Sequence, residues 1–357
     1  MKILFTISSL NTGGAEKILT TLANHFETLG HSVSILIISK DKPFFPLSRT
    51  INLIGVDIPK SSSKLLSRVT YIPKLINAIR KNILFENPDI VISFMSEMNI
   101  LSIVASKLSK KPILVSERSA YDFLDIKPFW KKLRRIVYPF ANGLVVLTDA
   151  DKERYSFVKN RYKIENPLIL QEKYTNLQRE NVILSVGRLN YVKGFDMLIE
   201  AFAKTRQKEW RLKIVGEGKE RQNLEELIKK LNLEDRVELV GQKEDVEYFY
   251  KKASIFVLSS RTEGFPGVLC EAMGYGCAVI AFDSPSAPRE IISHEKDGIL
   301  IEAKNVKALT KSMDSLMIDS SKRLRLGKNG QKIVERLDID KIANKWLDII
   351  ENIRESV

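Results

Sequence analysis

The amino-acid sequence predicts an α/β protein with two doubly wound domains, each a parallel sheet covered by helices. Short apolar strand patterns alternate with amphipathic helix patterns, which is typical of strand–helix–strand units. The alternation starts again after Asn166-Pro167, which predicts a second sheet. A chain of 357 residues also exceeds what one hydrophobic core usually organises, so two domains are expected.

The first predicted domain, residues 1–165, opens with a strand, a glycine-rich turn and a helix. The turn contains Gly13 and Gly14, where a diphosphate or an acceptor could approach the backbone closely. A plain tight turn is the alternative, because the GxGxxG pattern of a dinucleotide site is absent. Strands are predicted at residues 2–9, 33–38, 90–94, 113–116 and 143–147.

The second predicted domain covers residues 166–339. Its strands are predicted at residues 182–186, 212–215, 237–240, 255–258, 279–282 and 299–301, with helices between them, for example at 197–204 and 224–231. The final segment, residues 340–357, is amphipathic and is expected to pack on the first domain. A cleft between two such domains is the default place for a ligand.

The composition of 44% hydrophobic and 28% charged residues is typical of a soluble globular protein. No apolar run reaches the roughly 20 residues of a membrane span, and the first apolar stretch is too short for a signal peptide. Two cysteines, Cys270 and Cys277, fit a reducing cytosol better than a disulfide framework. We therefore expect a cytoplasmic protein.

The positive charge is unevenly distributed, since the first 165 residues contribute +11 of the net +13. No acidic residue occurs between Asp57 and Glu86, and Pro73 must kink the predicted helix there or begin a second one. The cations expected to form a basic face of this stretch are Lys60, Lys64, Arg68, Lys74 and Lys81. This face either meets anionic lipid or substrate phosphates, or is simply solvated.

A second basic cluster combines Lys131, Lys132, Arg134 and Arg135 with nearby aromatic residues. Aromatics among cations suit a membrane interface, although they also suit packing against a core. Nucleic acid fits less well as the anionic partner, because no recognition-helix, zinc-finger or single-strand-binding pattern occurs. The first domain is therefore expected to face an anionic membrane surface.

The first turn of the second domain has the composition of a diphosphate site. Arg188 follows the strand-end glycine Gly187, and Lys193 comes five residues later beside Gly194. Two cations at the carboxyl end of a strand, together with helix N–H groups, suit a diphosphate. Gly216, in Val215-Gly216-Glu217-Gly218, marks another glycine turn after a strand.

The stretch from Ser259 to Glu271 joins a buried strand to a helix through a turn rich in glycine and proline. Unpaired N–H groups at the start of such a helix suit an anion. Glu263 and Glu271 flank that position. Because carboxylates repel phosphate, we expect them to bind neutral hydroxyls of a sugar or ribose. The alternative is a capped helix with ordinary surface glutamates.

Together these motifs resemble the family 4 retaining glycosyltransferases of the GT-B fold, which use nucleotide sugars. They follow the family's order: Gly187-Arg188-Leu189 with Lys193-Gly194, then Gly216-Glu217-Gly218, then Glu263 and Glu271 separated by seven residues. Asn11-Thr12-Gly13-Gly14-Ala15-Glu16 resembles the family's first turn, so the resemblance covers essentially the whole chain. The basic first domain, with Tyr138-Pro139-Phe140-Ala141, is most similar to bacterial members that extend polyprenyl-diphosphate-linked oligosaccharides, some of which add N-acetylgalactosamine.

The resemblance implies a role for each matching residue. Arg188 and Lys193 would hold the donor diphosphate and stabilise the leaving nucleotide. Glu263 would bind the transferred sugar and Glu271 the ribose hydroxyls. Further donor contacts are expected from Gly264, Phe265, Gly267, Val268, Gly216, Gly241 and Gln242, the last two near the base. Gly13 and Gly14 would admit the diphosphate and the acceptor.

Arg118 departs from the family's pattern, because many members have a histidine after the residues that match Ser116-Glu117. A cation at this position could contact the phosphate of the donor or acceptor. The hydrogen-bond-accepting role of a neutral imidazole is lost, which leaves the role of Arg118 and the sugar specificity open.

The expected activity is retaining transfer from a UDP-sugar to a lipid-diphosphate-linked glycan, peripheral on the cytosolic face of the inner membrane. Neither a metal nor another cofactor is expected, and the departing phosphate would itself help to deprotonate the acceptor. Alternatives are a soluble acceptor, a nucleotide-sugar epimerase or hydrolase, and a non-catalytic basic scaffold. A metal-dependent GT-A transferase needs an Asp-x-Asp, which Asp149-Ala150-Asp151 matches by letters. This segment is interpreted instead as a capped helix start.

Overall fold

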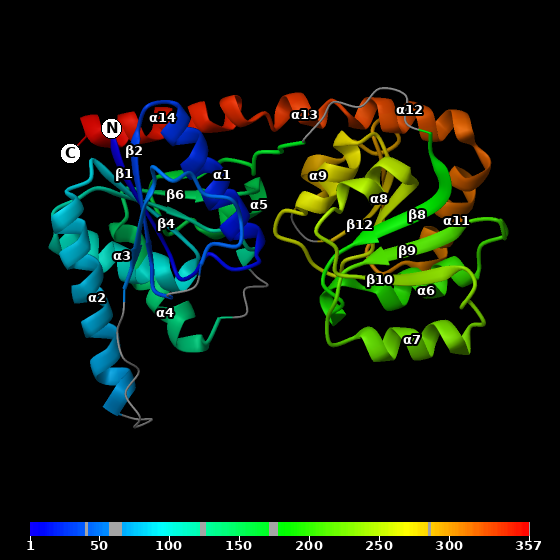
Figure 1. Ribbon diagram of the computed structural model, residues 1–357, viewed down its shortest axis with the longest axis horizontal. Coiled ribbons are helices and arrows are strands. Elements are labelled where there is room, and N and C mark those ends of the chain that lie inside the picture. The colour runs from blue at the N-terminus through cyan, green and yellow to red at the C-terminus, as the bar shows by residue number, and fades with distance from the viewer. Residues whose placement is uncertain (40–41, 57–65, 122–125, 171–177, 285–286, 357) are drawn as a thin grey trace. The chain divides into compact units, whose positions relative to one another are not determined.

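The computed structural model describes residues 1–39, 42–56, 66–121, 126–170, 178–284 and 287–356 (Figure 1). The chain divides into two compact units, Met1–Pro167 with Ile339–Val357, and Leu168–Asp338. The sequence placed these boundaries at residues 165/166 and 339/340, within two residues of the observed ones. Each unit is a parallel sheet with helices on both faces, which confirms the predicted fold class.

Unit 1 contains a seven-stranded parallel sheet in the order β3-β2-β1-β4-β5-β6-β7. Its strands are β1 Lys2–Ile7, β2 Ser32–Ile37, β3 Asn52–Gly55, β4 Ile90–Phe94, β5 Ile113–Ser116, β6 Gly143–Val146 and β7 Arg161–Lys163. Its helices are α1 Gly14–Thr28, α2 Leu66–Glu86, α3 Ser96–Leu108, α4 Pro128–Val137, η2 Tyr138–Phe140, α5 Asp149–Arg154 and α14 Ile339–Glu355.

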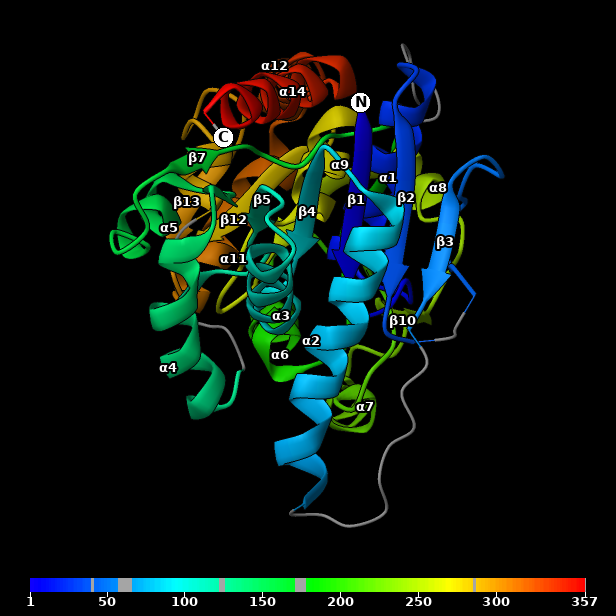
Figure 2. The same cartoon turned by 90° about the vertical axis from the view of Figure 1, so that its left-hand side faces the viewer.

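The helices of unit 1 cover two separate cores. On one face α1 and α14 pack together over the central strands, and Phe5 of β1 and Phe26 of α1 are fully buried in this core. On the other face α2 lies beside α3 (Figure 2), burying Ile79 and Ile83. Strands buried on both faces need continuous apolar sequence, which explains why β1 and β4 were visible in the sequence.

Unit 2 contains a six-stranded parallel sheet in the order β10-β9-β8-β11-β12-β13. Its strands are β8 Glu180–Val186, β9 Arg211–Val215, β10 Val237–Gly241, β11 Ala253–Leu258, β12 Ala278–Asp283 and β13 Ile299–Glu302. Its helices are η3 Tyr191–Lys193, α6 Phe195–Ala203, α7 Arg221–Lys230, α8 Glu247–Lys252, α9 Gly267–Gly274, α10 Pro288–Ile291, α11 Val306–Ile318, α12 Ser320–Gly330 and α13 Ile333–Arg336.

The C-terminal helix α14 belongs to unit 1, which confirms the predicted return of the tail. One face of the helix is buried at three- and four-residue spacings, as an amphipathic helix against a core requires. The buried residues are Ile342, Ala343, Trp346, Ile349, Ile350 and Ile353.

Some features differ from the sequence-based expectations. The edge strands β3 and β7 were not predicted. Helix α2 continues unbroken through Pro73, so the alternative of a second helix beginning there is wrong. Within the described part of the chain, the helices are too short or too polar to cross a membrane.

Candidate functional site

The candidate site of unit 2 lies where the chain changes direction across the sheet. From β8 the chain proceeds outward to β9 and β10, whereas β11, on the other side of β8, leads outward to β12 and β13. The loops that follow β8 and β11 therefore diverge at neighbouring strand ends. This topological switch point is where open α/β sheets bind their ligands.

Lys193 and Glu263 meet at this switch point although they lie 70 residues apart in the sequence. The Lys193 Nζ is 2.6 Å from Glu263 Oε1, and the side chains are 22% and 9% exposed. Ser260 Oγ donates a hydrogen bond to the same carboxylate oxygen at 2.5 Å. A lysine ammonium has three N–H donors, so Lys193 can keep its hydrogen bond to Glu263 while it donates to a further acceptor.

The backbone around Lys193 is fixed by short local contacts. Lys193 ends the turn η3, whose N-cap Asn190 accepts from the Lys193 N–H through Oδ1 at 3.2 Å. Gly194 follows at φ +64°, and a Cβ there would lie 2.2 Å from the Ser259 carbonyl oxygen. Only glycine fits this conformation and this close approach.

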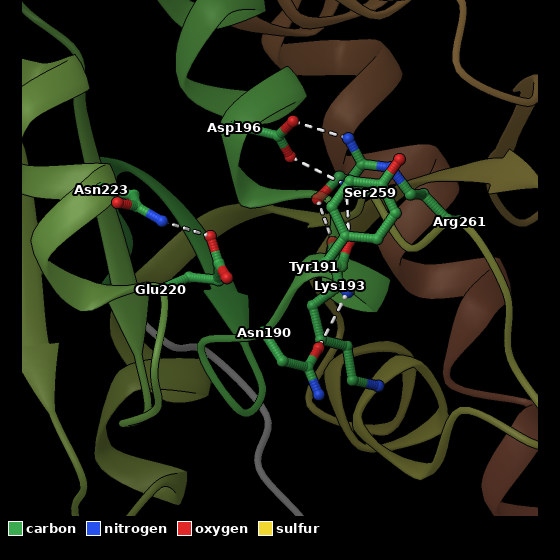
Figure 3. Close-up of polar contacts among 8 residues, drawn as sticks. All are labelled: Asn190, Tyr191, Lys193, Asp196, Glu220, Asn223, Ser259 and Arg261. Atoms are coloured by element: carbon green, nitrogen blue, oxygen red, sulfur yellow. Dashed lines mark hydrogen bonds and ion pairs between the residues drawn. The ribbon is translucent and has the colours of Figure 1, made fainter. Parts of the chain in front are cut away.

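Sequence reasoning missed the ion pair between Asp196 and Arg261, which joins the first turn of α6 to the loop after β11 (Figure 3). Arg261 Nη1 and Nη2 donate to Asp196 Oδ1 and Oδ2 at 2.9 and 2.6 Å. The guanidinium also lies 3.9 Å from the centre of the Tyr191 ring. Asp196 lies two residues after Gly194 and Arg261 two residues before Glu263, but no sequence pattern pairs them, because the pairing depends on strand order.

Glu271 is half-buried on α9, the helix that follows the loop containing Glu263. Its Oε2 accepts a hydrogen bond from the Tyr250 hydroxyl at 3.0 Å. Burial, followed by the negative charge of Glu271, raises the pKa of Tyr250 well above its usual value, so Tyr250 stays a neutral donor. Tyr250 was not singled out from the sequence.

The segment that begins α9 differs in one respect from its predicted role as a set of outward N–H groups. The Gly267 N–H donates to the Phe265 carbonyl at 3.0 Å. Gly264, Phe265 and Val268 are half-buried, and Gly267 is exposed. A donor contact through the Gly267 N–H therefore requires that hydrogen bond to be replaced.

The loops after β8, β9 and β10 are linked to one another by backbone contacts. Gly216 has φ +144°, and its N–H donates to the Gly241 carbonyl at 2.9 Å. A Cβ on Gly216 would lie 1.9 Å from the Gly187 carbonyl oxygen, so the two glycine turns touch directly. Arg188 and Gln242 are exposed on these loops. The predicted contacts of these residues with a donor stay predictions.

In unit 1, Gly13 and Gly14 lie at the corresponding switch point, between β1 and β4. Gly13 is the N-cap of α1 in extended backbone conformation, and Gly14 is the first helical residue. A Cβ on Gly14 would meet nothing within 4 Å, which leaves space beside the helix start. The neighbouring loop after β4 contains Met95 at φ 74°, a conformation rare for a residue with a side chain.

Arg118 is largely enclosed within unit 1, with 9% of its surface exposed. Its guanidinium lies beside the stacked rings of Phe94 and Trp346, 4.9 and 5.3 Å from their centres. Arg118 Nη1 donates to Asn166 Oδ1 at 2.8 Å. Burial lowers the pKa of Arg118 to about 9. The contact with a diphosphate expected from the sequence stays a prediction.

Beside Arg118, Glu117 is a buried carboxyl that sequence reasoning did not assign. Ser96 Oγ donates to Glu117 Oε1 at 2.7 Å, and the Tyr138 hydroxyl donates to the same oxygen. Burial raises the pKa of Glu117. Asn99 in turn donates to the Tyr138 oxygen at 3.1 Å, so the group forms a connected buried network.

The predicted basic surface is partly corrected. Arg134 is 2% exposed and donates to the Tyr155 hydroxyl at 2.9 Å, so its assignment to an exposed lipid-facing cluster is wrong. Its neighbours on α4, namely Lys131, Lys132 and Arg135, are exposed, as are the aromatic side chains Phe129 and Phe140. On α2, Lys74 and Lys81 are exposed. Lys60, Lys64 and the side chain of Arg68 lie outside the described residues.

The Asp149-Ala150-Asp151 segment is a helix start, as interpreted from the sequence. Thr148 is the N-cap of α5 and accepts from the Asp151 N–H at 3.0 Å. Asp149 pairs with Lys163 at 2.7 Å, whereas Asp151 accepts from the Tyr121 N–H at 2.9 Å. In the described ranges, three His, Cys, Asp or Glu side chains do not gather in a metal-binding geometry.

Comparison with known families gives two matches that follow the two units. Residues 12–161 match the model of Glycosyltransferase Family 4, and residues 169–333 match that of Glycosyl transferases group 1. A Campylobacter jejuni relative is 31% identical over all of both chains. It is named GalNAc-alpha-(1->4)-GalNAc-alpha-(1->3)-diNAcBac-PP-undecaprenol alpha-1,4-N-acetyl-D-galactosaminyltransferase. The amylovoran biosynthesis glycosyltransferase AmsD of Erwinia amylovora is 28% identical over 98% of this chain and 99% of its own.

Solved structures give the same architecture. Anabaena Alr3699/HepE, crystallised in complex with UDP, superposes with a TM-score of 0.81 at 18% identity, over 99% of this chain and 100% of its own. Sucrose-phosphate synthase from Thermosynechococcus elongatus superposes with a TM-score of 0.83 at 20% identity, over all of both chains. At this identity the likeness shows the fold alone.

Proposed function

We propose, starting from the fact that this chain belongs to the family 4, group 1 glycosyltransferases, that it transfers a sugar from a UDP-sugar to a lipid-diphosphate-linked glycan with retention of configuration. The observation that best supports the site is the Lys193–Glu263 pair at the switch point of unit 2. A cation and a carboxylate lie side by side there, and a sugar diphosphate has an anionic group for the first and hydroxyl groups for the second.

In this proposal the charged half of the donor site is formed by Arg188 and Lys193. Both follow β8, and their cations would bind the diphosphate oxygens. As the bond between sugar and phosphate breaks, negative charge grows on the leaving nucleotide. Fixed cations stabilise that charge more than they stabilise the intact donor, so they lower the barrier.

Glu263 and Glu271 would form the hydroxyl-binding half. Glu263 would accept hydrogen bonds from the transferred sugar while Lys193 and Ser260 hold its Oε1 in place. Glu271, oriented by Tyr250, would accept from the ribose hydroxyls. Gly264, Phe265, Val268, Gly241 and Gln242 would complete the donor contacts, the last two near the base.

The proposed chemical step requires no side-chain base. The acceptor hydroxyl oxygen bonds to the sugar's anomeric carbon on the face from which the phosphate departs. The bond from that carbon to the phosphate oxygen breaks, and the hydroxyl proton passes to the departing phosphate. The residues above bind and orient the donor, and no metal is needed in this proposal.

A lipid-linked acceptor is supported by two observations. The Campylobacter jejuni relative is named for an undecaprenol-linked acceptor, and the exposed part of α4 combines cations with aromatic side chains. Cations attract anionic head groups, and aromatic rings prefer the membrane–water interface. We therefore place the enzyme peripherally on the cytosolic face of the inner membrane.

The test compares Lys193→Ala and Glu263→Ala with wild type in a screen of nucleotide sugars and lipid-linked acceptors, read by mass spectrometry. Both variants should lose transfer and still bind vesicles that contain anionic lipid. Lys322→Met is the matched control, because it removes a lysine–glutamate pair away from the site, between Lys322 on α12, a lysine of similar exposure, and Glu295 before β13. Transfer that survives both site substitutions would refute the site, and release of free UDP without acceptor would identify a hydrolase instead.

The acceptor part of the proposal has its own test on α4. Charge reversal at Lys131, Lys132 and Arg135 should raise the KM for a lipid-linked acceptor and leave the Kd for UDP unchanged. The control reverses Lys229 and Lys230, at the end of α7 in unit 2. An unchanged acceptor KM would show that these cations are ordinary solvated side chains, and it would favour a soluble acceptor.

A further inference from the structure

We propose that the Asp196–Arg261 ion pair is a positioning device for the donor site, which sets Lys193 and Glu263 in register before a donor arrives. This inference rests on the proposed function, because it assigns no new ligand. It adds Asp196 and Arg261 to the site and explains why these two positions carry a carboxylate and a guanidinium.

Arg261 and Ser259, on the loop after β11, hold the whole turn that contains Lys193. The carbonyl oxygen of Tyr191 accepts from Arg261 Nη1 at 2.6 Å. The carbonyl of Val192 accepts from the Arg261 N–H at 2.7 Å. The carbonyl of Lys193 accepts from Ser259 Oγ at 2.9 Å. Three consecutive carbonyl groups are thus bound by one short segment, and Figure 3 shows the contacts of Tyr191 and Lys193.

These contacts fix the electrostatics as well as the position of the turn. Carbonyl oxygens carry partial negative charge and repel phosphate. Because the three carbonyls of η3 are directed to donors of the neighbouring loop, they are occupied before a phosphate arrives, and the Lys193 ammonium projects from a turn of fixed backbone. A preorganised cation needs no rearrangement as charge develops on the leaving group.

Asp196 explains why an arginine is needed at position 261. The carboxylate accepts two hydrogen bonds from the guanidinium, and the side chain of Arg261 is only 12% exposed. A bidentate pair restricts the plane of the guanidinium, which a lysine cannot reproduce. Tyr191 also restricts the guanidinium, because the centre of its ring lies 3.9 Å from the guanidinium carbon.

The same two loops contain the Lys193–Glu263 pair, so the ion pair acts on the site through the backbone. Glu263 lies two residues after Arg261, and Asp196 lies three residues after Lys193. The backbone of Gly194 is in close contact with the carbonyl group of Ser259. Loss of the guanidinium therefore frees both partners of the catalytic pair without removing either of them.

The experiment measures UDP-sugar turnover and UDP binding in Arg261→Met, Arg261→Lys and Asp196→Asn. We expect Arg261→Met and Asp196→Asn to lower kcat by about ten- to a hundred-fold, the effect of losing a charged hydrogen-bonded pair. The Kd for UDP should rise by a smaller factor than kcat falls, because Glu271 and the loops after β9 and β10 are untouched. Arg261→Lys, which keeps the charge and loses the fork, should restore less than half of the lost activity.

The matched control is Arg236→Met. Arg236 also stacks on an aromatic ring, Phe202 at 4.5 Å, and also donates to two backbone carbonyls, but it lies just before β10, at the amino edge of the sheet. This variant should lower thermal stability about as much as Arg261→Met and leave kcat unchanged. Hydrogen exchange without ligand should accelerate in residues 190–196 of Arg261→Met and not in Arg236→Met.

The outcomes separate the inference from the proposed function. If Lys193→Ala loses turnover while Arg261→Met keeps kcat and loop protection, the positioning role is wrong and the proposed function stands. If Arg261→Met and Arg236→Met lose kcat equally, the ion pair is only structural. If wild type neither binds UDP nor turns over any nucleotide sugar, the proposed function fails, and the inference fails with it.

Discussion

Gly216→Ala tests whether the two glycine turns of unit 2, after β8 and β9, are in direct contact. A Cβ at this position would lie 1.9 Å from the Gly187 carbonyl oxygen and 2.8 Å from its carbon. Since such contacts are not made below 3.0 Å, one of the two loops must move by roughly 1 Å. Both loops lie at the strand ends that form the candidate donor site.

The magnitude follows from two terms. Overpacking of this kind costs about 1–3 kcal/mol, and a residue with a side chain at φ +144° costs about 1–3 kcal/mol more. We therefore expect the free energy of unfolding of unit 2 to fall by about 2–6 kcal/mol. Against a typical total of about 5–15 kcal/mol, this is a large loss.

The assay is urea unfolding followed by the fluorescence of Trp210, which is 1% exposed and is the tryptophan of unit 2. In all proteins compared, Trp130 and Trp346 of unit 1 are replaced by phenylalanine, so that the fluorescence reports the unfolding of unit 2 alone. Gly267→Ala is the control, since a Cβ there meets nothing within 4 Å and it is the first residue of α9. Equal urea midpoints for the two variants would refute the reasoning.

Two further predictions concern the buried charges of unit 1. Arg118→Met should lower the free energy of unfolding of unit 1 by about 1–3 kcal/mol and accelerate hydrogen exchange in α14, because the variant loses the hydrogen bond to Asn166 and the cation–π contacts with Phe94 and Trp346. The exposed α14 substitution Lys345→Met should do neither, and equal exchange in the two would contradict the contacts. Because burial raises the pKa of Glu117, its contribution to stability is full below the ordinary value of 4.5 and is lost as the pH rises through the raised value. Glu117→Gln keeps a neutral acceptor for Ser96 and Tyr138, so its unfolding free energy should fall less over that pH range, and an unchanged pH slope in urea unfolding would show that Glu117 is not the group responsible.

The sheets could be predicted because their central strands are buried on both faces. β1, β4 and β11 consist almost entirely of buried apolar residues, and the sequence shows this directly. The edge strands β3 and β7 have no such signal. β3 is mostly exposed, and β7 is the half-buried sequence Arg-Tyr-Lys, so their pairing depends on a neighbour that is distant in the sequence.

The motif residues of the site could be located from the sequence, but their partners could not. Lys193 and Glu263 were each assigned to a strand-end loop and to one donor, Lys193 to its diphosphate and Glu263 to its sugar, but no contact between the two residues was predicted. Their 2.6 Å contact follows from the adjacency of β8 and β11, which local sequence does not specify. The Asp196–Arg261 pair was missed for the same reason.

Arg134 was misassigned for a different reason, because its burial can be read from local sequence. It lies four residues after Trp130 and three before Val137, the spacing of one helical face. Val137 is buried, Trp130 is half-buried, and Arg134 stacks on Tyr121 and Tyr155. Counting the four cations together by charge concealed a periodicity that separates Arg134 from Lys131, Lys132 and Arg135.

The pairing of charges in unit 2 bears on which cations of the proposed donor site would attract the donor from a distance and which would contact it. Lys193 is balanced by Glu263, and Asp196 by Arg261, so neither pair adds net charge to the loops after β8 and β11. Arg188 is exposed on the same edge and adds a positive charge that an approaching diphosphate meets in water. In the proposed site, Arg188 would therefore contribute to the long-range attraction of the donor, an effect that weakens with salt, whereas Lys193 would act at short range on the leaving phosphate.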